Sequence, residues 1–431
     1  MKTVTTTLML FLSLHVFANT FKTEKWVTNN GVQVIFFQAM EVPMLDISLA
    51  FAAGSAYDGS QYGLSALTGQ MMNQGNAGKD ATTVAEALAD TGAQFNAENS
   101  KDMIVFSLRT LTDHQALEQS KTTFSQIINH PDFPDDAFNH EKKQLLMAIE
   151  QAKDSPEEIA NLNFFKVLYQ QHPYAHPLNG TTASMSALKK SDVIQFYKHY
   201  YVGANAFLVI AGAIDHHQAH QIAEQLTHEL PQGTPATPVP KAKPLTHAEK
   251  INIKFPSSQT IIRLGQMGID HQNPDYFPLV VGNYILGGGS LGSQLGVEVR
   301  EKRGLTYGID SQFVPMLGKG PFLISLSSKN DQATTALKII DETLQKFINN
   351  GPSQHELAAA KRYLTGSFPL SLASNRSITG LLLRIAFYHL PDNYLDTYVA
   401  HINAVTNEEI KQAFKRQINP NNLLLITVGQ S

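Results

Sequence analysis

The sequence predicts an α+β fold with two homologous domains, each a mostly antiparallel sheet backed by helices, joined by a proline-rich linker. Three observations support this prediction. The 431 residues exceed the length of one ordinary core. The same order of strand and helix patterns occurs twice, and a stretch with five prolines separates the two occurrences.

Residues 1–18 have the pattern of a secretory signal peptide. Lys2 precedes an apolar run from Leu8 to Ala18, and the run ends with small residues at the two positions that a signal peptidase reads. Because about 20 apolar residues are needed to span a bilayer, this run is too short to be a membrane helix. We therefore predict cleavage after Ala18 and a periplasmic mature protein; the alternative is a disordered or core-packed N-terminus.

Composition limits the classes of function. The chain has no cysteine, which excludes disulfides and thiolate zinc sites. A formal net charge of -4 gives no reason to expect nucleic acid or an anionic membrane as a partner. No second apolar segment is long enough to span a bilayer, so we expect no membrane insertion after signal cleavage.

In the first half, a strand pattern at Leu45 to Phe51 is followed by a helical stretch from Gly63 to Gly78. A second helix is expected from Thr82 to Asp90, and a second strand from Met103 to Leu108. The apolar and β-branched residues of the two strand segments are typical of buried strands. A long surface helix is expected over Asp135 to Ala152, with Asp135 as a candidate N-cap.

The second half repeats this order. Strand patterns at Ile261 to Leu264 and Phe322 to Leu326 flank a helix around Tyr276 to Leu286. The spacing between corresponding elements is roughly 215 residues, far longer than solenoid periods. A surface helix is expected up to Ser367, with Ser353 as its candidate N-cap.

The linker spans residues 231–244, and its prolines exclude a helix interior or a central strand. This places the domains at residues 19–230 and 245–431. Neither half shows strict βαβ alternation, which favours antiparallel or mixed sheets backed by helices.

A glycine loop in the second half precedes a candidate binding motif. Gly287, Gly288 and Gly289 are predicted to permit positive φ angles and the close approach of another backbone, such as that of a peptide substrate. A helix follows, with Leu291, Leu295 and Val299 as its apolar stripe and Gly304 as its C-terminal glycine.

Arg300 falls in the last turn of this helix, and Tyr307 is expected to open the next strand. A guanidinium and a phenol side by side make a clamp for a peptide carbonyl or carboxylate. The alternative is structural: an arginine at a helix C-terminus and a tyrosine packed at a strand edge.

The segment GGGSLGSQLGVEVREKRGLTYGI resembles the C-terminal signature of the pitrilysin-type zinc peptidases, in particular the mitochondrial-processing-peptidase branch with its short bacterial relatives. The resemblance extends over essentially the whole mature chain. In that family an Arg and a Tyr seven residues apart contact substrate, and Arg300 and Tyr307 match that spacing. Arg303 lies nearby, but its spacing to the tyrosine does not match.

The zinc motif of the family is missing. Active members carry HxxEH in the first domain, because His at i and i+4 share one helix face for zinc while the Glu activates the bound water. The corresponding positions are Ala66, Gly69 and Gln70. The third ligand would fall near Ala148, and the nearest acid is Glu150. We therefore expect no metal and no cofactor in this chain, with zinc held by a partner.

Two other histidine pairs deserve comparison with a zinc site. His172 and His176 are four residues apart, but neighbouring prolines prevent a regular helix. His216 and His220 can share one helix face, yet no Glu lies between them, and an ordinary solvated helix start is the simpler interpretation.

The resemblance implies a non-zinc subunit of a heterodimeric metallopeptidase. In that branch one chain brings the zinc helix and the other brings Arg and Tyr, so peptide hydrolysis is expected only with an HxxEH-bearing homologous subunit. One alternative is an inactive scaffold or interaction protein of the same fold. Another is a self-sufficient hydrolase that uses His216 and His220, and a homodimer also stays open.

Overall fold

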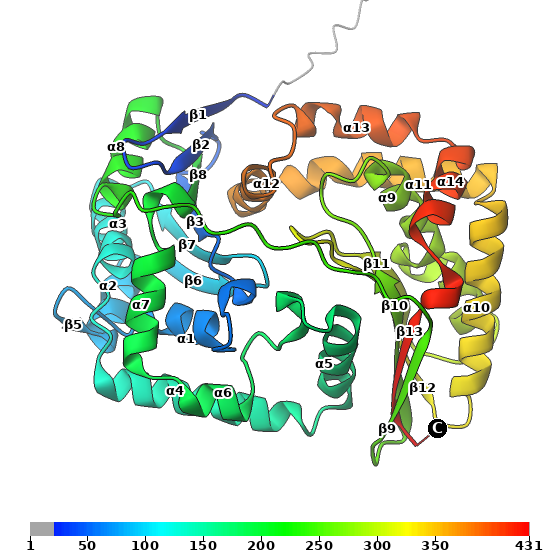
Figure 1. Cartoon of the computed structure of the whole chain (residues 1–431). Coiled ribbons are helices and arrows are strands. Elements are labelled where there is room, and N and C mark those ends of the chain that lie inside the picture. Colours follow the sequence, from blue (N-terminus) through cyan, green and yellow to red (C-terminus); the bar gives the residue numbers. More distant parts are fainter. Residues whose placement is uncertain (1–20, 431) are drawn as a thin grey trace, which may run out of the picture.

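The computed structural model describes residues 21–430, so the predicted signal segment 1–18 lies outside the described residues. Two halves lie side by side, and an extended segment crosses from one to the other (Figure 1). Residues 231–245, which include the proline-rich stretch, form neither helix nor strand. The domain limits at 230 and 245 stay a prediction.

The first sheet, within the described residues, has six strands in the order β1-β2-β8-β3-β7-β6. Only the β2–β8 pair is parallel, and every other neighbouring pair is antiparallel. The bounds are β1 (Thr23–Val27), β2 (Gln33–Gln38), β3 (Met44–Phe51), β6 (Gln94–Asn99), β7 (Ile104–Leu111) and β8 (Ala206–Gly212).

The second sheet repeats this pattern with five described strands in the order β11-β12-β10-β13-β9. As β3 does with β7 and β8, β10 pairs antiparallel with β12 and β13, and β9 is parallel to β13. The bounds are β9 (Glu249–Lys254), β10 (Gln259–Met267), β11 (Ile309–Phe313), β12 (Pro321–Lys329) and β13 (Leu424–Gly429). The matching pair pattern confirms the predicted fold of two related, mostly antiparallel halves.

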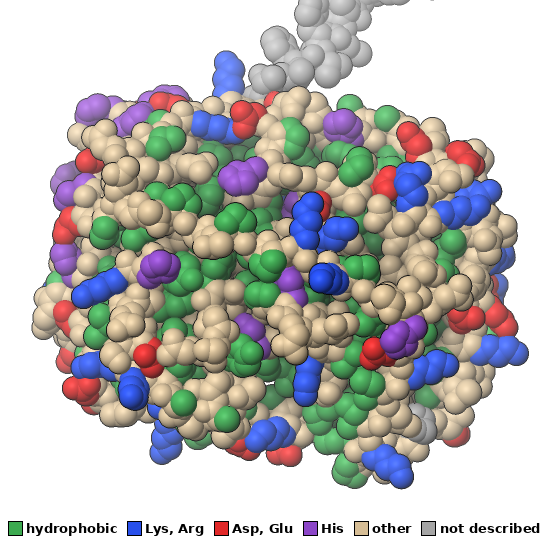
Figure 2. Space-filling view, in the orientation of Figure 1, with side chains coloured by type: hydrophobic (Ala, Val, Ile, Leu, Met, Phe, Trp, Pro, Cys, Tyr) green, Lys and Arg blue, Asp and Glu red, His purple; other side chains and the backbone are tan. Residues whose placement is uncertain are grey.

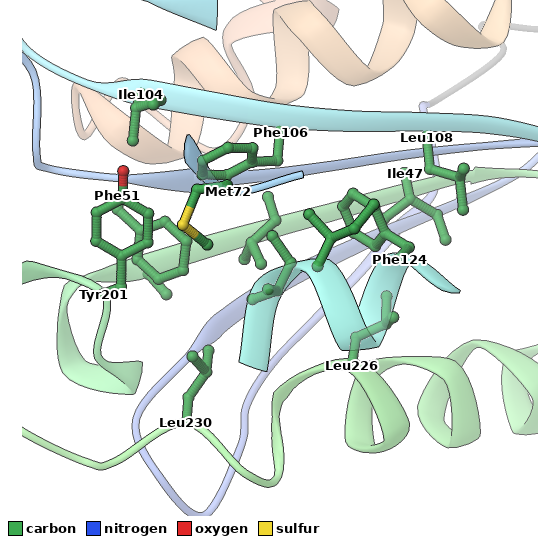
Figure 3. Close-up of a cluster of buried hydrophobic side chains, with 14 of the residues drawn as sticks. Ile47, Phe51, Met72, Ile104, Phe106, Leu108, Phe124, Tyr201, Leu226 and Leu230 are labelled. Carbon is green, nitrogen blue, oxygen red and sulfur yellow. The ribbon is translucent and has the colours of Figure 1, made fainter. Parts of the chain in front are cut away.

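Helices cover each sheet because one face of the strands is apolar. In β7, Phe106 and Leu108 point into the first core, where they meet Phe124 and Leu226 of two helices (Figure 3). The helices of the first half are α1 (Leu64–Met71), α2 (Ala81–Ala89), α3 (His114–Asn129), α4 (Asp135–Ala152), α5 (Pro156–Tyr169), α6 (Thr182–Ala187), α7 (Lys190–Tyr200) and α8 (His216–Thr227). Those of the second half are α9 (Tyr276–Asn283), α10 (Ala333–Asn350), α11 (Gln354–Ser367), α12 (Asn375–Phe387), α13 (Tyr394–Ala404) and α14 (Asn407–Gln417).

The two halves exchange one helix each. α5 of the first half packs on β10 and β13 of the second sheet, and α12 of the second half packs on β3 and β8 of the first sheet. The apolar clusters at these contacts are fully enclosed, with Phe164 and Ile426 at one and Leu382 and Val209 at the other. Each sheet is therefore completed by a helix from the other half.

Several local expectations are corrected. The helix expected from Gly63 to Gly78 ends at Met71, and the chain then turns into the short hairpin β4 (Gly75–Asn76) and β5 (Lys79–Asp80). α4 begins at Asp135, but its N-cap is Pro134 and no side chain caps it. Ser353 does cap α11, where it forms a capping box with Glu356. In the described part of the chain, no helix combines the length and apolar character needed to cross a membrane.

Candidate functional site

The zinc-helix positions lie on α1, and two of the three are buried. Ala66 and Gly69 face the protein interior, whereas Gln70 is exposed. A Cβ atom added at Gly69 would lie 2.3 Å from the Cδ1 methyl of Ile104 on β7. The Ile104 side chain therefore occupies the space that the general-base glutamate of an HxxEH helix would need.

The position of the third ligand is also unsuited to metal. Ala148 lines a cavity of about 530 Å³ between the two halves. Glu150 instead pairs at the surface with Lys153 at 2.7 Å and accepts a hydrogen bond from Thr182 at 2.7 Å, and these contacts lower its pKa. Among residues 21–430, no group of three or more His, Asp or Glu side chains is arranged to hold a metal ion. The residues present do not fit zinc.

His172 and His176 flank a single 3-10 turn, Pro173–Ala175, and serve structural contacts. His172 Nε2 lies 2.7 Å from the carbonyl oxygen of Pro240 in the linker. His176 is buried, and burial lowers its pKa to about 4. This pair does not form a ligand face.

His216 and His220 lie one turn apart on α8, and both contact Glu24 of β1. The His220 Nε2 to Glu24 Oε1 distance is 2.8 Å, and the ring of Trp26 stacks on His220 with centroids 3.9 Å apart. Hydrogen bonds from both histidines lower the pKa of Glu24. Histidines gather at the rim of the molecule over β1 and α8 (Figure 2), where this cluster ties the edge strand to the helix.

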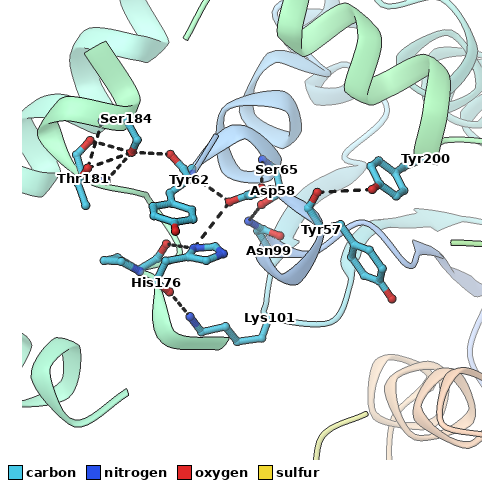
Figure 4. A network of polar contacts seen from close by, with 12 residues as sticks. Tyr57, Asp58, Tyr62, Ser65, Asn99, Lys101, His176, Thr181, Ser184 and Tyr200 are labelled. Carbon is cyan, nitrogen blue, oxygen red and sulfur yellow. Dashed lines mark hydrogen bonds and ion pairs between the residues drawn. The ribbon is translucent and has the colours of Figure 1, made fainter. Parts of the chain in front are cut away.

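A buried polar network fixes the start of α1 (Figure 4). Asp58 accepts hydrogen bonds at 2.8 Å from the backbone N–H groups of Gly63 and Ser65, and burial raises its pKa to about 7. Lys101 donates to the carbonyl oxygen of His176, and burial lowers the lysine pKa to about 8. This network could not be predicted from the sequence, because its members come from three separated segments.

Asp102 joins the two halves. Its carboxylate accepts hydrogen bonds from the hydroxyl of Tyr174, the hydroxyl of Tyr388 at 3.1 Å and the backbone N–H of Leu317 at 3.1 Å. Only 1% of Asp102 is exposed, and burial raises its pKa. Two of these three donors belong to the second half, so Asp102 is a direct polar link across the cavity.

The glycine loop is packed rather than left-handed. None of Gly287, Gly288 and Gly289 has a positive φ; Ser290 has, at 54°. A Cβ at Gly287 would lie 2.4 Å from the hydroxyl oxygen of Ser311, so close packing against β11 requires this glycine. The first two glycines end a π-helical turn, Tyr284–Gly288, instead of forming an open loop.

The following helical segment brings Arg300 to its last turn, within the π-helix Gly296–Glu301, and Gly304 ends it with a φ of 62°. Leu291 is 45% exposed and does not belong to the apolar stripe, unlike the fully buried Leu295 and Val299. At the start of the segment, the Ser293 hydroxyl accepts a hydrogen bond from the backbone N–H of Gly296 at 3.1 Å.

Arg300 and its neighbour Arg303 differ in their side-chain contacts. Arg303 donates to the side chain of Glu298 at 2.7 Å, whereas the Arg300 guanidinium has no hydrogen-bond or ion-pair partner among the residues described. Tyr307 lies in a bend before β11, which begins at Ile309, so it does not open the strand as expected. It is 82% exposed.

Neither Arg300 nor Tyr307 lines the cavities of about 530 and 670 Å³ between the halves. Tyr307 lies at the surface of the second half, and Arg300 is half-buried. The functional roles predicted for Arg300, Tyr307 and the three glycines stay predictions.

Comparison with known proteins adds the family context. Residues 35–182 match the family described as insulinase (peptidase family M16), and residues 187–364 match the peptidase M16 inactive domain. An uncharacterized zinc protease of Bacillus subtilis is 24% identical, covering 95% of this chain and 98% of its own. A protein of Helicobacter pylori named as a non-peptidase homolog is 26% identical, covering 94% of each chain.

Comparison with solved structures supports these family matches. A crystal structure described as a peptidase M16 inactive domain from Pseudomonas fluorescens has a TM-score of 0.92 and 37% identity, over 95% of this chain and 98% of that one. A chain of complex III from Candida albicans shares the fold alone, with a TM-score of 0.79 and 17% identity over 94% of this chain and 95% of that one.

Proposed function

Because this chain belongs to the M16 family of peptidases, we propose that it is the non-zinc subunit of a periplasmic heterodimeric metallopeptidase. It presents Arg300 and Tyr307 to a peptide bound at the zinc site of an HxxEH-bearing partner chain. The observation that carries the proposal is a contrast between two places. The methyl group of Ile104 fills the base position at Gly69, while Arg300 has no hydrogen-bond or ion-pair partner among the residues described and Tyr307 is mostly exposed.

The chemistry follows from the two groups. The guanidinium is permanently charged and offers paired N–H donors, so Arg300 holds a carbonyl or carboxylate of the peptide in a fixed orientation. The Tyr307 phenol donates one hydrogen bond to the oxygen on which negative charge develops. The hydrogen bond from the exposed Tyr307 becomes strong only when a partner surface excludes water around the tyrosine.

The second candidate is an inactive scaffold or interaction protein. The name of the Helicobacter pylori relative, a non-peptidase homolog, favours it. A scaffold needs neither an unpaired Arg300 nor an exposed Tyr307, which is why we place it second.

The deciding experiment compares hydrolysis of quenched fluorogenic peptides, with added zinc, by this chain, by an HxxEH-bearing homologue from the same cell, and by their mixture. Activity in the mixture well above that of either chain would support the proposal. Activity of this chain alone would instead point to a self-sufficient hydrolase, and a complex that forms without any gain in hydrolysis would favour the scaffold.

Variants then test the two residues. Tyr307→Phe and Arg300→Ala should each lower turnover of the pair by about 10²-fold, the size seen for loss of one oxyanion donor. Arg303→Ala is the matched control, because Arg303 lies in the same segment but pairs with Glu298. Size-exclusion chromatography checks assembly; equal turnover in all three variants would remove Arg300 and Tyr307 from the mechanism.

A further inference from the structure

A groove of about 670 Å³ lies between the first sheet and α12. Its floor is one face of β3, β7 and β6, the face opposite to the apolar core. Next to the apolar Met103 and Val105, this face carries a group of polar side chains: Asp46, Ser48, Asn96, Glu98, Ser107 and Arg109. Such a floor offers hydrogen-bonding groups to a polar ligand.

The charges in the groove do not cancel. Arg109 and Asp46 neutralise each other through two hydrogen bonds, at 2.9 and 3.1 Å. Glu98 then faces two arginines of α12, Arg376 and Arg384, so the groove has an excess of positive charge.

The two arginines are free to bind an anion. Among the described residues, the Arg376 side chain donates to one partner, the neutral side chain of Gln94 at 3.3 Å. Arg384 has no hydrogen-bond or ion-pair partner within residues 21–430. His271 on the opposite wall is uncharged at neutral pH, because its pKa is lowered to about 4, mainly by burial and to a smaller extent by the positive charge of Arg384. It adds no further charge to the groove.

Gly380 provides a second, independent observation. It lies in the interior of α12, one helical turn from each arginine, and lines the same groove. A Cβ added there would meet no atom within 4 Å, so packing does not require glycine at this position. Glycine destabilises a helix interior relative to alanine. The open space at Gly380, between the two arginines, is suited to a peptide that crosses the helix.

We infer that this groove binds acidic segments of peptides, with Arg376 and Arg384 as the carboxylate partners and Gly380 as the crossing point. Guanidinium groups bind carboxylates through two parallel hydrogen bonds. The inference deepens the proposed function, on which it rests, since it names the class of peptide that the complex would take.

The test measures binding to the purified mature chain without partner or zinc. A fluorescein-labelled peptide rich in Glu is titrated by fluorescence anisotropy, next to matched peptides in which Gln or Lys replaces each Glu. We expect the Glu-rich peptide to bind most tightly. Arg384→Glu and Arg376→Glu should each weaken it by about tenfold, or ~1.4 kcal/mol.

Lys143→Glu is the matched control, because Lys143 is an exposed residue of α4 that does not line the groove. It should change the affinity by less than about twofold, since surface charges at a distance are screened. Equal binding of the Glu-rich and Gln-rich peptides, or equal effects of the Arg384 and Lys143 variants, would overturn the inference.

Gly380→Trp fills the groove without changing its charge, and it should abolish binding while the circular dichroism spectrum stays that of the wild type. Unchanged binding by this folded variant would also overturn the inference. Because this readout needs no hydrolysis, an inactive mixture that still binds the Glu-rich peptide contradicts the proposed function and leaves the groove supported.

Discussion

Replacing Gly69 by alanine tests whether Ile104 blocks the former base position. The new Cβ would lie 2.3 Å from Ile104 Cδ1, far inside the contact distance of ~3.5–4.0 Å. Ile104 is 1% exposed, so its methyl cannot turn out to solvent. Overpacking of this kind destabilises by ~1–3 kcal/mol, while alanine improves the helix by ~1 kcal/mol. Gly69→Ala should therefore lower the free energy of unfolding by up to ~2 kcal/mol.

Ile104→Val removes the methyl that clashes and by itself costs ~0.5–1.5 kcal/mol. In that background Gly69→Ala keeps only its helix benefit, so its effect should reverse to a gain of ~1 kcal/mol. Urea unfolding followed by circular dichroism measures all four variants of the cycle. Gly380→Ala, at a helix glycine with open space, is the control and should stabilise both backgrounds by ~1 kcal/mol.

The reasoning is refuted if Gly69→Ala stabilises the wild type as much as it stabilises the Ile104→Val variant. If the sign reverses as expected, restoring a glutamate at position 69 also requires a smaller residue at 104.

Three further predictions concern stability. Asp102→Ala should lower the free energy of unfolding by ~3 kcal/mol, because it leaves one buried and two partly buried donors without their acceptor; a loss below ~1 kcal/mol in urea unfolding would contradict this. The pKa of His271 falls from 6.5 to about 4 on folding, so between these pH values the unfolded chain binds more protons than the folded chain. The free energy of unfolding should therefore fall as the pH falls from 6.5 to about 4. His271→Gln should reduce this pH dependence, and an unchanged slope would exclude a contribution from His271. Tyr307→Phe should change stability by less than ~0.5 kcal/mol. Thr306 is buried and its hydroxyl donates to the carbonyl oxygens of Gly308 and Ser327, so Thr306→Ala should cost ~1–3 kcal/mol in thermal unfolding; a large effect at Tyr307 would favour a structural role.

The strands with strong apolar patterns could be predicted from the sequence, and β6 could not. Its residues, Gln94 to Asn99, are mostly polar, and the strand exists because β7 pairs with it along its whole length. Tertiary pairing here outweighs local propensity.

The same limit applies to the candidate site. The spacing of Arg300 and Tyr307 is local, so it could be predicted, and so could the missing zinc motif on α1. The partners of Asp102 could not, because this network joins segments far apart in the chain. The sequence alone also does not explain why residue 69 is glycine, because the explanation is its contact with Ile104 on another element.

The exchange of α5 and α12 imposes an order on biosynthesis. The face of the first sheet that carries Phe207 and Val209 is covered by Leu382 and its neighbours on α12. These residues are made more than a hundred and fifty positions later along the chain. While synthesis continues, this apolar part of the sheet face stays uncovered and prone to aggregation. The first half therefore cannot reach its final form as it emerges, and the growing chain needs protection until nearly its last helices have been made.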